Sequence, residues 1–111
     1  MNNLTSDELK NIFDGEKNLS NKPIFIFFKA DWWGPCRMFK QVLDKVYPDY
    51  NDKIDMYDVD IDKETDMAIQ FGARSIPYLV LISKGGEATA QMGSLDENGL
   101  RYYLDGLISK K

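Results

Sequence analysis

Four short runs of apolar and β-prone residues along the chain predict β-strands. The first run, residues 24–28, is continuously apolar, which is typical of a central strand buried on both faces. Further strands are expected over residues 54–61, 78–82 and 88–92. The sequence KGGE at residues 84–87 separates the last two runs, so it predicts a hairpin turn between them.

Capping residues and apolar positions at helical spacing indicate two helices in the first half of the chain. Thr5 followed by Glu8 is a capping-box pattern, so a helix is expected from about Ser6. A second helix is expected after the Gly34-Pro35 turn, because a proline in the first turn of a helix sacrifices no hydrogen bond. The apolar positions of this second helix are Met38, Phe39, Val42, Leu43 and Val46.

Two more helices are predicted in the second half. One should cover residues 64–71 and end at Gly72, which suits a left-handed cap. Asp96 is the expected N-cap of the last helix, whose predicted buried stripe contains Leu100, Tyr103, Leu104, Leu107 and Ile108. The order αβαβαββα predicts the α/β class, as a single domain over residues 1–111 with a mixed central sheet flanked by helices on both faces.

The composition excludes several kinds of chemistry. One cysteine and no histidine leave no internal disulfide, no Cys/His zinc site and no histidine general base. The formal net charge of -4, with scattered basic residues, argues against nucleic acid or an anionic membrane as the main partner. No metal is expected either. The sequence DVDID is similar to the start of a calcium loop, but Lys63 stands where that loop needs glycine.

No part of the sequence predicts a targeting or membrane-spanning segment. The N-terminal sequence MNNLTSDELK lacks the basic start and the apolar run of a signal peptide. The longest apolar run, PIFIFF, is too short to cross a bilayer. A reducing cytoplasm is therefore the expected location.

One segment resembles the active site of a known family. FFKADWWGPCRMF, residues 27–39, is similar to the active-site segment of thioredoxins, whose pattern is Trp-Cys-Gly-Pro-Cys at a strand-to-helix junction. The sequences VDID, SIPYLVLI, KGGE and QMGSLDENGL follow in the family's order, up to about residue 108. The resemblance implies a thioredoxin fold with a cis bond between Ile76 and Pro77. Because only MNNL precedes the first helix, the family's first strand is expected to be short or absent, which leaves about four strands.

The resemblance also implies a thiol–disulfide oxidoreductase lineage, but one reactive residue is missing. The family's reaction uses two thiols three residues apart, of which the first attacks a disulfide and the second resolves the mixed disulfide. In this chain the first position is Trp33 and the second is Cys36. Dithiol exchange is therefore expected to be abolished or strongly impaired, with Cys36 a largely inert and partly buried thiol.

The resemblance further implies a shallow groove in which an extended peptide binds beside the cis proline. The residues expected to line it are Trp32, Gly34, Pro35, Ile76, Pro77 and Gly93. The expected partners are extended peptides or protein disulfides. A form with both cysteines would also use thioredoxin reductase or another thiol reductant. No cofactor is expected, and the chain is expected to be a monomer.

Three interpretations of the function stay open. The chain is a disabled member of the oxidoreductase lineage, a redox-inactive peptide-binding or scaffold module that uses Trp33 as a contact, or a slow monothiol acting through Cys36. Phe27 stands where many thioredoxins have an aspartate that accepts a proton from the resolving thiol, and Asp58 stands where a lysine often pairs with it. Phe27 is expected in the core. If the thiol-activation apparatus has been dismantled, Asp58 should either face solvent or cost several kcal/mol if it is buried without a partner.

Overall fold

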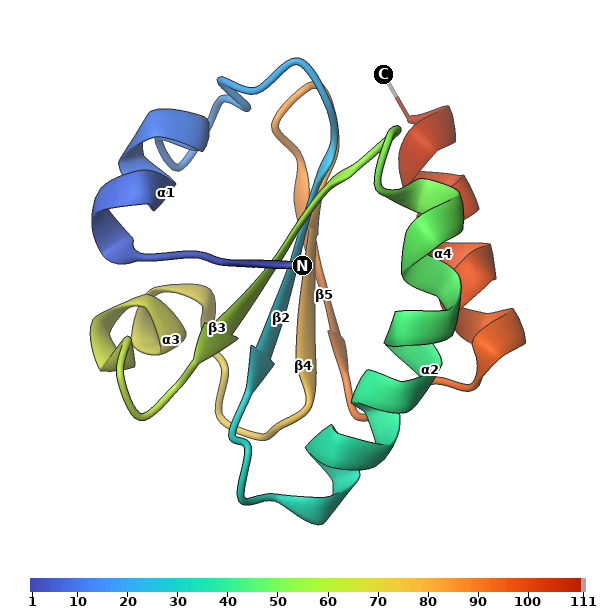
Figure 1. Ribbon diagram of the computed structural model, residues 1–111. Helices are drawn as coiled ribbons and strands as arrows, with labels where there is room; N and C mark the ends of the chain where they lie inside the picture. The colour runs from blue at the N-terminus through green and yellow to red at the C-terminus, as the bar shows by residue number, and fades with distance from the viewer. Residues whose placement is uncertain (111) are drawn as a thin grey trace.

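The chain folds into a five-stranded mixed sheet between two layers of helices, as a computed structural model describes for residues 1–110 (Figure 1). The strand order is β1-β3-β2-β4-β5, with β1, β3 and β2 parallel and the pairs β2–β4 and β4–β5 antiparallel. The strands are β1 (Asn2–Asn3), β2 (Ile24–Lys29), β3 (Asp55–Asp60), β4 (Tyr78–Ile82) and β5 (Ala88–Met92). The prediction of a short first strand is confirmed, and with it the sheet has five strands.

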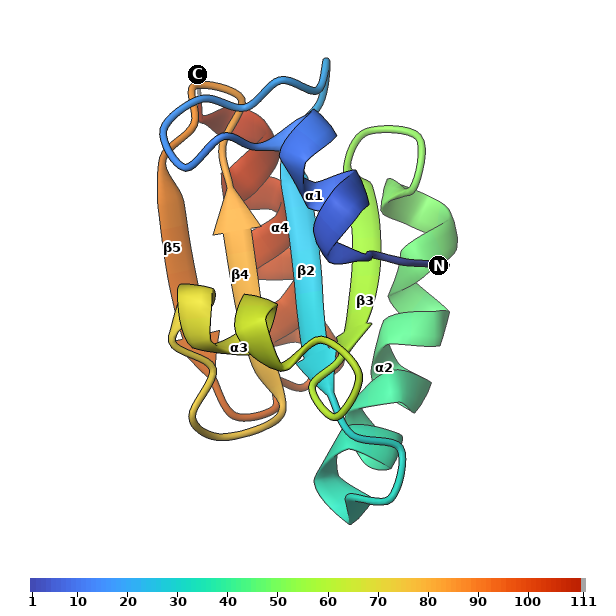
Figure 2. The same ribbon diagram turned by 90° about the vertical axis from the view of Figure 1, so that its left-hand side faces the viewer.

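Four helices cover the sheet, two on each face (Figures 1 and 2). They are α1 (Ser6–Ile12), α2 (Gly34–Tyr50), α3 (Thr65–Phe71) and α4 (Glu97–Ser109). α2 and α4 lie on one face, and α1 and α3 lie on the other. None of these helices combines the length and the apolar character needed to cross a membrane, within residues 1–110.

The helix ends follow the capping signals of the sequence. The side-chain oxygen of Thr5 accepts a hydrogen bond from the Glu8 N–H at 3.2 Å, at the start of α1. The Asp96 carboxylate accepts one from the Gly99 N–H at 2.7 Å, at the start of α4. Gly72 ends α3 in the left-handed conformation, with a φ of 74°. All three predicted caps are confirmed.

The central strand β2 divides two hydrophobic cores. Successive side chains of a strand point to opposite faces, so Phe25 and Phe27 pack beneath α2 and α4. Ile24, Ile26 and Phe28 pack instead beneath α1 and α3. Burial on both faces is the physical reason for the continuous apolar run in the sequence.

The predicted buried stripe of α4 is wrong at two positions. Leu104 and Leu107 are buried, but Tyr103 and Ile108 are exposed. Each exposed residue follows or precedes a buried leucine directly, so it points about 100° away from it around the helix. The Tyr103 side chain extends toward the edge strand β5, where its hydroxyl donates a hydrogen bond to the Gln91 side chain at 3.0 Å.

The connection between α1 and β2 is held against the hairpin that joins β4 to β5. The Asn18 side-chain amide donates hydrogen bonds to the carbonyls of Lys22 at 2.8 Å and Ser83 at 3.1 Å. Gly86 has a φ of 96°, and a Cβ built on it would overlap the Glu16 carbonyl oxygen. The polar connection predicted from the sequence is thus an ordered loop that passes close to the hairpin.

Candidate functional site

Three separate parts of the chain meet at one end of the sheet. β2 ends there and leads through the turn of residues 30–33 into α2 (Figure 1). β4 runs antiparallel to β2, so Ile76 and Pro77, which precede β4, lie beside the end of β2. The Gly93 N–H, directly after β5, donates a hydrogen bond to the Pro77 carbonyl at 2.9 Å. The Ile76–Pro77 peptide bond is cis, as the resemblance implied.

Trp33 is the N-cap residue of α2, and its side chain is exposed at this junction. Its N–H donates a hydrogen bond to the Ala30 carbonyl, and its own carbonyl accepts one from the Cys36 N–H, both at 3.1 Å. The backbone of the turn is therefore closed on both sides of Trp33. Its indole is 43% exposed, so an aromatic ring faces solvent where the family's attacking thiol would stand.

Trp32 forms a second exposed aromatic surface next to Trp33. The two indoles meet edge to face, with ring centroids 6.0 Å apart and planes at 69°. The Trp32 Nε1–H donates a hydrogen bond to the Asp62 carboxylate at 2.8 Å, which fixes the ring although it is 64% exposed. Together the two rings present an apolar surface at the mouth of the expected groove.

The other residues expected to line the groove have different degrees of burial. Gly34 is half-buried and Pro35 is exposed, in the first turn of α2. Ile76 is partly buried and packs against the core cluster that contains Cys36, and Pro77 is buried. All of them lie at the same end of the sheet. Their role in binding stays a prediction.

Cys36 is only 2% exposed and belongs to the core beneath α2. Burial raises the pKa of its thiol, and the backbone of Ala30 and the charge of Lys29 counteract only part of that effect. A raised pKa disfavours the thiolate, which is the form that attacks disulfides. Among residues 1–110 no other thiol accompanies it.

Lys29 lies below the turn and is a site residue that the sequence reasoning missed. Its side chain is 13% exposed and forms an ion pair with Asp31, and Asp60 is its neighbour on β3. Burial alone would lower the pKa of Lys29, but the Asp31 bond and the charges of Asp58 and Asp60 raise it overall. The signal in the sequence was a single charged residue ending an apolar run.

Phe27 and Asp58 lie side by side on neighbouring strands, in register. Phe27 is fully buried and meets Phe39 edge to face at 5.2 Å, which confirms the prediction that it is a core residue. Asp58 is partly buried rather than facing solvent, so the structure shows the second of the two outcomes considered for this residue. Burial raises the pKa of its carboxyl, and the Lys29 cation nearby opposes that rise. Lys29 forms its ion pair with Asp31 and acts on Asp58 only through its charge.

The arrangement has an exposed aromatic surface and one shielded thiol beneath it. Within residues 1–110, no group of three or more histidine, cysteine, aspartate or glutamate side chains is placed to hold a metal ion. The Lys29 cation interacts with Asp31, Asp58 and Asp60, and the Asp62 carboxylate is held by the Trp32 indole N–H.

The chain is similar to thioredoxins over almost its whole length. The family model for thioredoxin matches residues 4–106. The thioredoxin of Pseudomonas aeruginosa is 32% identical over 96 residues, which cover 86% of this chain and 89% of that protein. The thioredoxin of Haemophilus influenzae is 36% identical over 86 residues, covering 78% of this chain and 80% of that protein.

Solved structures agree on the fold. A crystal structure of chloroplastic thioredoxin z superposes with a TM-score of 0.82 and covers 96% of this chain and 93% of that one. Its sequence identity is 17%, so this likeness supports the fold alone. The family match carries the assignment further, because residues 4–106 include the turn, the cis proline and most of the last helix. This chain belongs to the thioredoxin family.

Proposed function

We propose that this thioredoxin-family protein no longer carries out dithiol–disulfide exchange and instead uses its groove to bind extended peptides. The observation that supports the proposal is that an indole, and not a thiol, is the side chain exposed to solvent at the start of α2. The exposed position holds the indole of Trp33, and the only thiol, Cys36, is buried one turn later. A disulfide that docks in the groove therefore meets an aromatic ring.

The missing thiol removes the intramolecular step of the reaction. In a dithiol protein the second thiol displaces the first from the mixed disulfide, with an effective molarity that can reach ~10⁵ M or more. A mixed disulfide formed by Cys36 would instead wait for an external thiol to attack it. Slow monothiol exchange is the second candidate function. Burial raises the pKa of the Cys36 thiol, and the Ala30 backbone and the Lys29 charge offset only part of that rise, so this exchange should be slow.

The lost reaction is tested by restoring the thiol in Trp33→Cys. We measure reduction of a protein disulfide with dithiothreitol as the electron source, and use Trp33→Ser as the matched control that removes the indole without adding a thiol. The present chain and Trp33→Ser should stay at the background rate of dithiothreitol. Trp33→Cys should exceed it by at least about 100-fold, because the intramolecular step is restored.

Two outcomes would count against parts of this proposal. If Trp33→Cys is as inactive as the present chain, the disabled-oxidoreductase interpretation fails, and peptide binding alone remains. If the present chain already reduces the disulfide well above background, the loss of activity is contradicted. In that case, comparison with Trp33→Ser shows whether the indole hinders access to Cys36. Trp33→Ser should be faster than the present chain only if the indole blocks the thiol.

The binding function is tested separately by titrating extended peptides into isotope-labelled protein. We expect shifts of the backbone amide signals of Trp33, Gly34, Ile76 and Gly93. Trp33→Ala should weaken binding by about 10-fold, because a large aromatic contact at the centre of an interface is typically worth more than 1 kcal/mol. Shifts confined to other parts of the chain would contradict the assignment of the groove.

A further inference from the structure

Strand β5 is an open edge of the sheet, with no further strand or helix beyond it within residues 1–110 (Figure 2). Natural proteins usually protect such an edge with a charged side chain, a proline, a bulge or a cover. β5 reads ATAQM and carries neither a charge nor a proline. Four of its five residues are exposed, including Met92, whose side chain is 66% exposed.

The hydrogen bonds at both ends of β5 show which of its backbone groups face away from β4. The Glu87 carbonyl accepts a bond from the Ser83 N–H at 2.8 Å, and the Gly93 N–H donates one to the Pro77 carbonyl at 2.9 Å. Residues of an antiparallel strand alternate between facing the partner strand and facing away from it. The residues that direct their N–H and C=O groups to the open edge are therefore Ala88, Ala90 and Met92.

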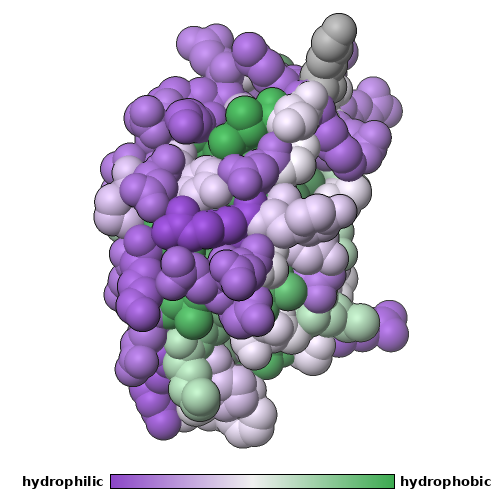
Figure 3. Space-filling view, turned by 90° about the vertical axis from the view of Figure 1, so that its right-hand side faces the viewer, coloured by the Kyte–Doolittle hydropathy of each residue, from purple (hydrophilic) through white to green (hydrophobic). Residues whose placement is uncertain are grey.

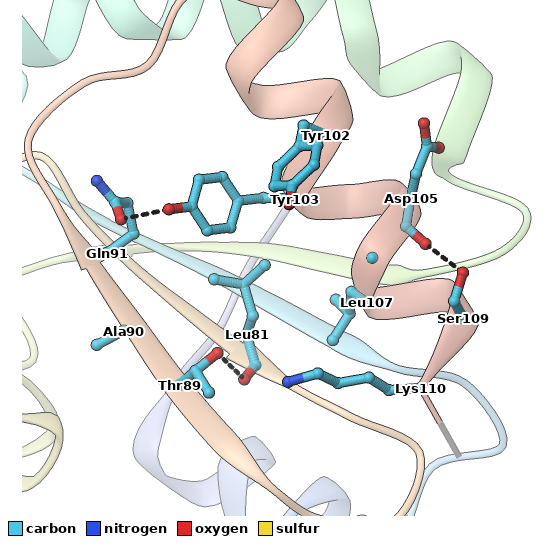
Figure 4. A pocket seen from close by; sticks show the side chains of 11 residues that line it. Leu81, Thr89, Ala90, Gln91, Tyr102, Tyr103, Asp105, Leu107, Ser109 and Lys110 are labelled. Atoms are coloured by element: carbon cyan, nitrogen blue, oxygen red, sulfur yellow. Dashed lines mark hydrogen bonds between the residues drawn. The ribbon is translucent and has the colours of Figure 1, made fainter.

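A cleft of about 540 Å³, lined by both polar and apolar side chains, adjoins this edge between β5 and α4 (Figure 4). Leu81 and Leu107 contribute its apolar lining, and the hydrogen bond between Tyr103 and Gln91 crosses it. Tyr102 is 77% exposed beside it, with its ring edge to face on that of Tyr103. The open strand is thus continuous with exposed aromatic surface.

We propose that β5 pairs antiparallel with β5 of a second copy of this chain, around a twofold axis at Ala90. Of the antiparallel registers, this one uses all the outward groups of both strands. Ala90 then exchanges two hydrogen bonds with Ala90 of the second copy, and Ala88 exchanges two with Met92 of the second copy, in both directions. The large exposed side chain of Met92 lies opposite the small one of Ala88.

The charges at the two ends of β5 favour this antiparallel arrangement. The hairpin end carries two positive side chains and one negative one: Lys84, Lys110 and Glu87. The other end leads into the start of α4, which carries two negative ones: Asp96 and Glu97. Arg101 bonds Glu97, but it also bonds Asp49 of α2 at 3.0 Å, so its charge is directed toward that helix. Antiparallel pairing brings the positive end of each copy beside the negative end of the other.

The face that α2 and α4 cover offers less to a second copy than the β5 edge does. Its surface is largely hydrophilic, with hydrophobic residues scattered over it (Figure 3).

The pairing at the β5 edge is expected to be weak. The Gln91 side chain already bonds the Met92 carbonyl at 3.1 Å, and this bond has to be exchanged for one across the interface. Five residues of strand bury less than the ~800 Å² per partner of a standard stable interface. The pairing is therefore concentration-dependent, and the monomer expected from the sequence is the species in dilute solution.

The register is tested by placing charges at the proposed axis with Ala90→Lys and Ala90→Glu. Each variant puts two like charges directly opposite each other in its own homodimer, so the association constant should fall at least about 10-fold. An equimolar mixture places opposite charges together and should regain association. Sedimentation equilibrium from about 10 μM to about 1 mM, with a reductant that prevents disulfides through Cys36, measures the mass above 12.8 kDa. Asn11→Lys, on the exposed side of α1, is the control that should behave as the original chain.

Each result decides for or against the pairing. A chain that stays at its monomer mass over the whole range overturns the proposal. Single variants that associate as well as the original chain, or a mixture that does not recover, overturn the register at Ala90. The Ala90 side chain is exposed, so both variants should keep the circular dichroism spectrum of the original fold. Recovery in the mixture would show that the charge, rather than a folding defect, caused the loss.

Discussion

Trp33 and Cys36 lie within one helical turn of each other, yet they differ sharply in their access to solvent. The backbone of the turn donates and accepts the hydrogen bonds around Trp33 whatever side chain it carries. The Trp33 side chain therefore does not determine the backbone conformation of the turn. It determines which chemical group the turn exposes to solvent. Lys29, at the end of β2 before the turn, forms an ion pair with Asp31.

Asp58 carries a prediction about pH. Burial raises the pKa of its carboxyl above the ordinary value of 3.8, so the folded protein binds this proton more tightly than the unfolded chain does. Its contribution to stability is fully present below about pH 3.8 and is lost as the pH rises through the higher folded pKa. Asp58→Asn should therefore stabilise the protein at pH 7, and the gain should shrink as the pH falls through the raised folded pKa and be lost by about pH 3.8.

Thermal unfolding of both proteins between about pH 3 and pH 8 measures this difference. Asp52→Asn is the matched control, because Asp52 lies exposed in the turn after α2 and its substitution should change little at either pH. If Asp58→Asn is less stable than the original chain at pH 7, the attraction between Asp58 and Lys29 outweighs the cost of burial, and the pKa of Asp58 is not raised.

At the scale of elements, the α1–β2 connection and the β4–β5 hairpin act as one unit. Gly86 needs its positive φ of 96°, and an added Cβ would also lie 3.1 Å from the Lys17 Cα. Gly86→Ala should therefore destabilise the protein by about 2 kcal/mol or more, since backbone strain and overlap with backbone atoms act together. Denaturant unfolding measures this loss of unfolding free energy, provided that the dependence of the free energy on denaturant concentration is the same in both proteins.

Gly106→Ala is the control with the opposite sign. Gly106 lies inside α4, and a Cβ added there meets no atom within 4 Å. Alanine should stabilise the helix by roughly 0.5–1 kcal/mol. Equal effects of the two substitutions would show that the close approach at Gly86 is relaxed easily by the neighbouring loop.

The elements that the sequence predicted best are those whose signals are local. Thr5 and Asp96 cap their helices through residues three positions later, and Gly72 supplies its own left-handed conformation. The pairing of β1 with β3 was not predictable in this way, because two polar residues carry no pattern and a distant strand decides their conformation. The close approach of Gly86 to Glu16 depends on the tertiary fold for the same reason.

The candidate site shows the same division. The structure brings residues 32–36, the cis proline and Gly93 to one end of the sheet, and the resemblance pointed to these segments because their order and spacing follow the family. It gave no information on Lys29, which the family pattern does not assign. Nor did it give the environment of Asp58, which depends on the side chain that β2 places opposite β3. To predict which charges are neighbours across two strands, the strand register must be known, and the register is fixed only by the tertiary fold.

At the scale of the whole molecule, β2 is the element that both cores share. Cys36 belongs to the core beneath α2 and α4, whereas Gly86 lies at the opposite end of the sheet, against the loop that follows α1. A small domain of this size usually unfolds in one cooperative step. If that holds here, a change near Gly86 should be felt at Cys36 although the two residues have no contact.

The reaction of Cys36 with a thiol reagent measures this coupling. In the folded protein the reaction should be slow at neutral pH, because the thiol is buried and its pKa is raised. If only global unfolding exposes it, Gly86→Ala should accelerate labelling by about 30-fold for a loss of about 2 kcal/mol, and Gly106→Ala should slow it. An unchanged rate in both variants would instead indicate that the start of α2 opens locally. Rapid labelling of the folded chain would contradict the burial of Cys36 itself, and it would favour monothiol exchange over peptide binding as the surviving chemistry of the turn.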